Sequence, residues 1–120
     1  MPLLAKAPLA HAMKQQGGGK VSGYDNKHPR QQQSELTGFG ARCLAAHQNS
    51  FEAMIFFAPA AVLTIATNTL TATTAWLCIT WVVCRLAYLI CYWRNWDLMR
   101  SSVWAIAIIC NFYLFFSCLN

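Results

Sequence analysis

Charged side chains are scarce in this sequence. Only 11% of its 120 residues are Asp, Glu, Lys or Arg, while 57% are hydrophobic. A soluble domain carries about 25% charged residues, so this composition does not suit a surface that faces water. A hydrocarbon core of about 30 Å needs about 20 apolar residues in a helix, so the length allows three or four crossings in one domain. The remaining residues are too few for a separate enzyme domain outside the membrane.

Paired cysteine motifs are also missing, and nothing in the first residues resembles a cleavable signal peptide. Its cysteines include no C-x-x-C pair, and all of them lie in or beside apolar runs: Cys43, Cys78, Cys84, Cys91, Cys110 and Cys118. This placement favours small apolar helix residues over disulfides. The N-terminus has neither the long apolar core nor the small-residue site of a signal peptide.

The apolar runs predict four helices, over about residues 1–14, 39–66, 75–93 and 101–119. The first is too short to cross a hydrocarbon core, and we expect it to be the last part of a longer helix. Gly17 to Gly19 break that segment, and a threonine-rich turn separates the second and third helices. The fold prediction is therefore an all-α integral membrane helical bundle with a short or truncated first helix.

The positive charges lie in two connections between the apolar runs. Lys14, Lys20, Lys27 and Arg30 lie around the first, and Arg94 and Arg100 around the other. Basic residues that bind nucleic acid form a stripe on a soluble face, so the net charge of +5 does not indicate a nucleic-acid partner. Connections rich in Lys and Arg remain on the cytoplasmic side of a membrane. We therefore predict that both connections are cytoplasmic and that the chain termini lie on the opposite side.

Ionisable side chains inside the apolar runs are the candidate functional residues. A turn of about 100° per residue puts Arg42 and Asn49 nearly in line on one helix, with Glu52 on the adjoining edge. The same arithmetic aligns Arg85, Tyr88 and Tyr92 on the next helix.

Two interpretations of these residues remain open. We expect Glu52 and Arg85 to lie at similar depth in the membrane and to interact. This pair either stabilises the packing of the helix bundle or belongs to a ligand site. His47 is interpreted as a helix–helix hydrogen-bond residue rather than a metal ligand, because no second His or Cys stands at ligand spacing. The sequence therefore predicts no metal site.

Three motifs in this region resemble one known family. R-C-L-A-A-H-Q-N-S-F-E, residues 42–52, resembles the signature helix of the MAPEG family, the membrane-associated proteins in eicosanoid and glutathione metabolism. R-L-A-Y-L-I-C-Y, residues 85–92, resembles a motif on the family's third helix, and Arg100 with Ser101 resembles the pair that opens its fourth. G-Y-D-N-K-H-P-R, residues 23–30, resembles the bacterial, uncharacterised inner-membrane branch.

The resemblance implies a four-helix subunit in a homotrimer in the bacterial inner (cytoplasmic) membrane. It further implies that glutathione binds between subunits near the cytoplasmic side, where its thiolate attacks or reduces a lipophilic small molecule. The positions that match glutathione-binding residues are Arg42, Asn49, Glu52, Arg85, Tyr88 and Tyr92. Arg100 and Ser101 match the positions that stabilise the thiolate, and are the expected catalytic residues.

The chain departs from the family's enzymes at several positions. Ala45 and Gln48 stand where those enzymes often carry arginines, Trp104 stands where they have a tyrosine, and Tyr88 replaces a histidine. The leading hypothesis is a membrane-embedded glutathione transferase or peroxidase. The alternative is a non-enzymatic trimeric scaffold or accessory subunit of a larger membrane complex. A transporter is disfavoured, because the helices show no internal repeat and no broken-helix pair.

Overall fold

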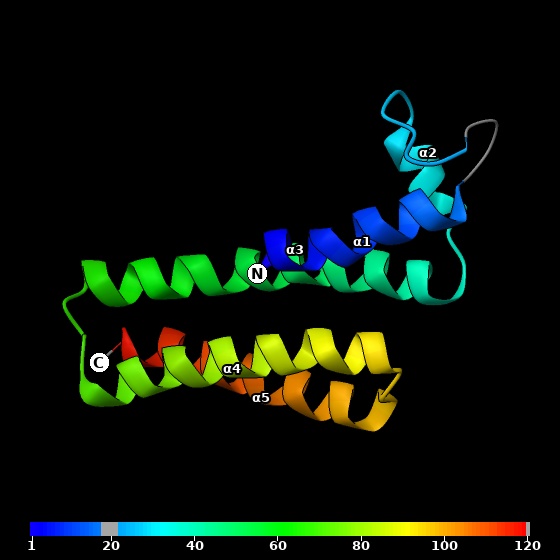
Figure 1. Ribbon diagram of the computed structural model, residues 1–120. Helices are drawn as coiled ribbons and strands as arrows, with labels where there is room; N and C mark the ends of the chain where they lie inside the picture. The colour runs from blue at the N-terminus through cyan, green and yellow to red at the C-terminus, as the bar shows by residue number, and fades with distance from the viewer. Residues whose placement is uncertain (18–21, 120) are drawn as a thin grey trace. The chain divides into compact units, whose positions relative to one another are not determined.

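The computed structural model describes residues 1–17 and 22–119, and its regular structure there is entirely helical (Figure 1). The helices are α1 (Pro2–Gln16), α2 (Pro29–Ser34), α3 (Gly38–Ala66), α4 (Ala72–Arg94) and α5 (Asp97–Ser117). The predicted all-α fold with four main helices is confirmed, and α2 is a short addition within the predicted polar connection. Most of the predicted glycine break, Gly18 and Gly19, lies outside the described residues, as does Lys20.

Three of the helices are long and apolar enough to cross a membrane. They are α3, α4 and α5, with 29, 23 and 21 residues. At 1.5 Å per residue they extend about 43, 34 and 31 Å, against a hydrocarbon core of about 30 Å. The 15 residues of α1 extend only about 22 Å. The chain forms two compact units, residues 1–50 and 51–120, and α3 begins in the first and ends in the second.

The first unit contains α1, α2 and the beginning of α3. Small and apolar side chains form its buried part: Ala5, Leu9, Ala12, Met13, Cys43 and Ala46. His47 Nδ1 on α3 donates a hydrogen bond to the carbonyl oxygen of Pro2 on α1, at 3.1 Å. The interpretation of His47 as a residue that joins two helices is therefore confirmed.

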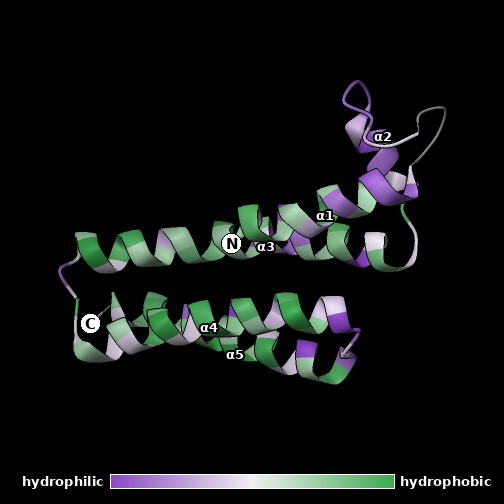
Figure 2. Ribbon diagram, in the orientation of Figure 1, coloured by the Kyte–Doolittle hydropathy of each residue, from purple (hydrophilic) through white to green (hydrophobic). Residues whose placement is uncertain are grey.

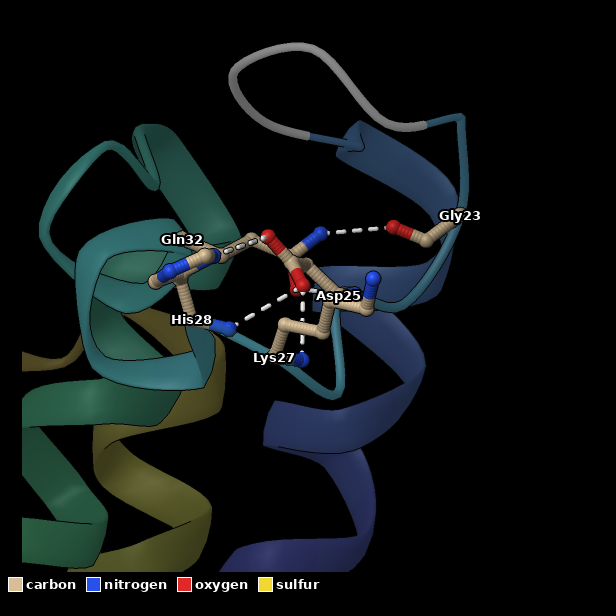
Figure 3. Close-up of polar contacts among 5 residues, drawn as sticks. All are labelled: Gly23, Asp25, Lys27, His28 and Gln32. Atoms are coloured by element: carbon tan, nitrogen blue, oxygen red, sulfur yellow. Dashed lines mark hydrogen bonds and ion pairs between the residues drawn. The ribbon is translucent and has the colours of Figure 1, made fainter.

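A buried glutamine organises the connection before α3 (Figure 3). Gln32 Nε2 donates to the carbonyl oxygens of Gly23, at 2.6 Å, and Met13, at 3.2 Å. Its Oε1 accepts from the backbone N–H of Asp25 at 3.0 Å. Asp25 Oδ1 in turn accepts from the backbone N–H groups of Lys27 and His28, at 2.8 and 3.0 Å. These contacts satisfy polar backbone groups, which explains how a polar segment without an apolar period becomes ordered.

These contacts predict an acid-sensitive connection. The hydrogen bonds from His28 and Lys27 lower the pKa of Asp25 from its ordinary value of 3.8. A lowered pKa contributes stability that is present above the unfolded value and is lost as the pH falls through the folded value. We expect the amide proton shifts of Lys27 and His28 in NMR spectra to titrate together with a midpoint below 3.8. A midpoint at or above 3.8, or the same titration in Asp25→Asn, would contradict the contact.

The second unit packs the remainder of α3 with α4 and α5. Trp81, Cys84, Ala107 and Cys110 form its buried cluster, against which Met54 and Phe57 of α3 also pack. The rings of Phe57 and Trp81 stack with centroids 3.9 Å apart and planes at 11°. Apolar side chains also cover the outside, including Ile109, Phe112 and Phe116, and the ribbons of α4 and α5 are largely hydrophobic (Figure 2). An apolar exterior is what a lipid-facing helix requires.

Local sequence features at both ends of α4 determine where this helix begins and ends. Thr71 and Thr74 form a capping box, in which each side chain bonds to the other residue's backbone N–H, at 2.9 and 3.2 Å. This cap starts α4 at Ala72, three residues before the apolar run indicated. At the other end Asn95 adopts a left-handed conformation, with φ of 61°, which closes the helix before α5 begins at Asp97.

Candidate functional site

A buried arginine stacks on a tyrosine along one face of α4. The side chain of Arg85 is 3% exposed, and its Cζ atom lies 4.3 Å from the ring centroid of Tyr88. Tyr88 meets Tyr92 edge to face, with centroids 5.1 Å apart and planes at 63°. The spacing of three and then four residues puts these side chains on successive turns of the same face, as the sequence predicted.

A second arginine, from α5, completes this stack. Arg100 Cζ lies 4.7 Å from the ring centroid of Tyr92. Arg85, Tyr88, Tyr92 and Arg100 therefore form a cation–aromatic column with a guanidinium at each end. Arg85 is the buried end, whereas the Arg100 side chain is 29% exposed. Since a guanidinium over an aromatic ring keeps its N–H edge available, Arg100 can still bind an anion.

Asp97 forms an ion pair with Arg100. Its Oδ1 atom lies 3.3 Å from Arg100 Nη1, and its side chain is 69% exposed. The two residues are three positions apart at the start of α5, where side chains at that spacing are neighbours. Asp97 was not among the residues predicted from the sequence, although its D-x-x-R spacing from Arg100 is a signal that indicates the pair.

Glu52 belongs to the same unit as the column. The neutral ring of Tyr88 and the carboxylate of Glu52 both favour the charge of Arg85. Glu52 is on the part of α3 that packs with α4, next to Ala53 of the apolar contact. A carboxylate near a buried guanidinium reduces the cost of keeping that charge away from water.

Ser101 makes a local bond in this structure. Its Oγ donates to the backbone carbonyl oxygen of Asp97 at 3.1 Å. The hydroxyl proton is therefore engaged within the first turns of α5, while the oxygen still has lone pairs that accept. Ser101 can donate to a ligand only after this bond breaks, whereas Arg100 already presents donors.

The other two predicted binding residues, Arg42 and Asn49, lie on α3 in the first unit. Arg42 Cζ lies 5.9 Å from the ring centroid of Phe39. Its Nε atom is buried and has no hydrogen-bond partner within residues 1–17 and 22–119. A buried donor without a partner is costly, so an acceptor from a ligand would stabilise Arg42. Asn49 is half-buried on the same helix.

Two open depressions lie near polar groups. One, of about 360 Å³, is lined by Trp96, Asp97, Leu98 and Met99. The other, of about 320 Å³ in the first unit, is lined by Arg30, Gln33, Ser34, Leu44 and Gln48. Within the described ranges 1–17 and 22–119, no group of three His, Cys, Asp or Glu side chains could hold a metal ion.

The model of the MAPEG family matches residues 1–120, the whole chain. The chain belongs to the MAPEG family. It is therefore a multi-pass integral membrane protein in contact with the lipid bilayer, from a family of eicosanoid and glutathione metabolism. Neither the curated proteins nor the solved structures contain a match to it.

Proposed function

We propose that this MAPEG protein binds glutathione and uses its thiolate in a transferase or peroxidase reaction on a lipophilic electrophile. The observation that carries the proposal is the position of Arg100. It stands at the partly exposed end of the cation–aromatic column, fixed by the Tyr92 ring at 4.7 Å. A guanidinium that is held in place but reachable is the group required to bind and stabilise an anionic sulfur.

Arg100 would act by favouring the thiolate over the thiol. A nearby cation lowers a thiol pKa, so the proton leaves to water while the sulfur stays beside the guanidinium. In a transferase reaction the sulfur forms a bond to the electrophilic carbon, and a leaving group departs or the adduct takes up a proton. In a peroxidase reaction the sulfur attacks one peroxide oxygen and the O–O bond breaks, which gives glutathione sulfenic acid and an alkoxide that takes up a proton to become an alcohol. The thiol of a second glutathione then attacks the sulfenic sulfur, which forms the disulfide and releases water.

The other predicted residues suit the remaining groups of the tripeptide. Glutathione carries two carboxylates and one ammonium group. The Nε atom of Arg42, which has no hydrogen-bond partner among the described residues, suits a carboxylate. Glu52 offers a carboxylate for the ammonium group, and Asn49 a neutral amide. In this proposal Arg85 stacks on Tyr88, and Tyr88 contacts Tyr92. These contacts hold the Tyr92 ring in place against Arg100.

We further propose a homotrimer in a bacterial inner membrane, with the connection before α3 and the one between α4 and α5 in the cytoplasm. Lys27 and Arg30 in the first connection and Arg94 in the second support this orientation through their positive charge. Selective labelling of a cysteine introduced at Ser22 checks it. Reaction from the periplasmic side alone would contradict it.

One observation favours the scaffold alternative. Arg85 is 3% exposed, and its charge is already engaged by Tyr88 and Glu52. A guanidinium in that position stabilises the packing of the bundle without any ligand. The two functions differ at the Arg100 end of the column, because a scaffold has no need for a reachable cation there.

Isothermal titration of the purified protein with glutathione tests the proposed function. We expect saturable binding in the millimolar range or tighter, and clearly weaker binding to Arg100→Leu. Arg94→Leu is the matched control, because it removes the same charge beside the α4–α5 connection but not from the column. A wild-type protein that shows no saturable heat at millimolar glutathione would favour the scaffold.

A further inference from the structure

The Asp97 carboxylate contacts one nitrogen of the Arg100 guanidinium, which also lies over the Tyr92 ring. Tyr92 covers one face of the guanidinium at 4.7 Å, and Asp97 contacts its Nη1 edge at 3.3 Å. An anion that binds Arg100 through Nη1 must share this nitrogen with Asp97 or displace the carboxylate. The carboxylate and such an anion therefore compete for the Nη1 donors.

The exposure of the two side chains makes such displacement feasible. Asp97 is 69% exposed, against 29% for Arg100. Exposed ion pairs are weak because water solvates both charges, so the carboxylate can leave without the penalty of breaking a buried pair. The depression of about 360 Å³ lined by Trp96, Asp97, Leu98 and Met99 borders this carboxylate and gives it room to move.

We infer that Asp97 is a positioning residue that orients the Arg100 guanidinium in the absence of a ligand and is displaced from it when an anionic thiol binds. The inference rests on the proposed function, since it assigns a role around the same guanidinium. Without a ligand, the ring of Tyr92 and the carboxylate of Asp97 hold Arg100 in one orientation. With a ligand, the anion replaces Asp97 at Nη1, so the carboxylate lowers the affinity of Arg100 for the anion.

A structural role for Asp97 predicts a different outcome. As the acidic residue in the first turn of α5, Asp97 also interacts favourably with the helix dipole. If that were its whole role, Asp97→Asn would lower the melting temperature and leave the reactivity of Arg100 unchanged. The test therefore measures the chemical reactivity of the Arg100 guanidinium.

The experiment follows phenylglyoxal modification of Arg100 by mass spectrometry in wild type, Asp97→Asn and Asp97→Glu. Phenylglyoxal reacts with the neutral guanidine, which a contacting carboxylate disfavours. We expect Asp97→Asn to raise the rate at Arg100 about two- to five-fold, as for loss of an exposed ion pair. Asp97→Glu should restore a rate close to wild type. Arg94 in the same sample is the internal reference, and Glu35→Gln is the control for loss of one acidic charge elsewhere in the chain.

Titration with glutathione is the second arm. Asp97→Asn should bind it about two- to five-fold more tightly than wild type, because the competing carboxylate is gone. Equal phenylglyoxal rates at Arg100 in wild type and Asp97→Asn would overturn the inference. If the rates differ as expected but no variant binds glutathione, the positioning role stands and the proposed function fails.

Discussion

Replacing Trp81 by alanine is expected to lower the free energy of unfolding by about 3–5 kcal/mol, the usual cost of truncating a buried aromatic side chain. Trp81 is 2% exposed and stacks on Phe57 with ring centroids 3.9 Å apart. It also belongs to the cluster with Cys84 and Cys110, so its loss leaves a cavity where α3, α4 and α5 meet. Reversible unfolding in mixed detergent micelles measures the change.

Trp76→Ala is the matched control for this prediction. Trp76 lies on the same helix but is 68% exposed. Truncating it removes no core contact, so the change in detergent should stay within about 0.5 kcal/mol. Equal losses in the two variants would show that Trp81 is not at the centre of the second unit.

Replacing Arg100 by leucine is expected to reduce glutathione-dependent conjugation or peroxide reduction by about 100-fold, as for other donors aimed at a developing or bound anion. The structural reason is that Arg100 is the reachable guanidinium of the column, 29% exposed and seated on Tyr92. Leucine keeps a side chain of similar apolar bulk at this partly exposed position. The melting temperature should therefore stay close to that of wild type.

Arg94→Leu is the control for a change in net charge. Arg94 is the last residue of α4, across the short α4–α5 connection from Arg100, and its Cζ atom is 5.9 Å from the Trp96 ring rather than over a tyrosine of the column. It should retain wild-type activity. Activity that falls equally in both variants would mean that the positive charge of the connection matters and the position of Arg100 does not.

The spans and one face of the site were predictable from the sequence. Long apolar runs predicted α3, α4 and α5 because a membrane-crossing helix needs nearly continuous apolar residues. The spacing of Arg85, Tyr88 and Tyr92 predicted that they share a face of α4, since helical periodicity alone determines this. Both predictions depend only on local sequence.

Other features depend on contacts between distant residues. The short helix α2 was not predicted, because its residues PRQQQS have no apolar period and the surrounding connection is ordered through Gln32 and Asp25. The start of α4 was placed too late, because Thr71 and Thr74 look like turn residues until their capping box forms. Arg100 reaches Tyr92 only because α5 turns back along α4, which spacing along the chain does not reveal.

The most direct test of this account is the ultraviolet thiolate absorbance that appears when glutathione is added to the wild-type protein at neutral pH. We expect a saturable increase at millimolar glutathione, with one thiolate for each occupied site, because Arg100 stabilises the anionic sulfur. The increase should be lost in Arg100→Leu while the melting temperature is retained. No thiolate signal in the wild type at millimolar glutathione would contradict the account, and the cation–aromatic column would then be a structural element of a scaffold.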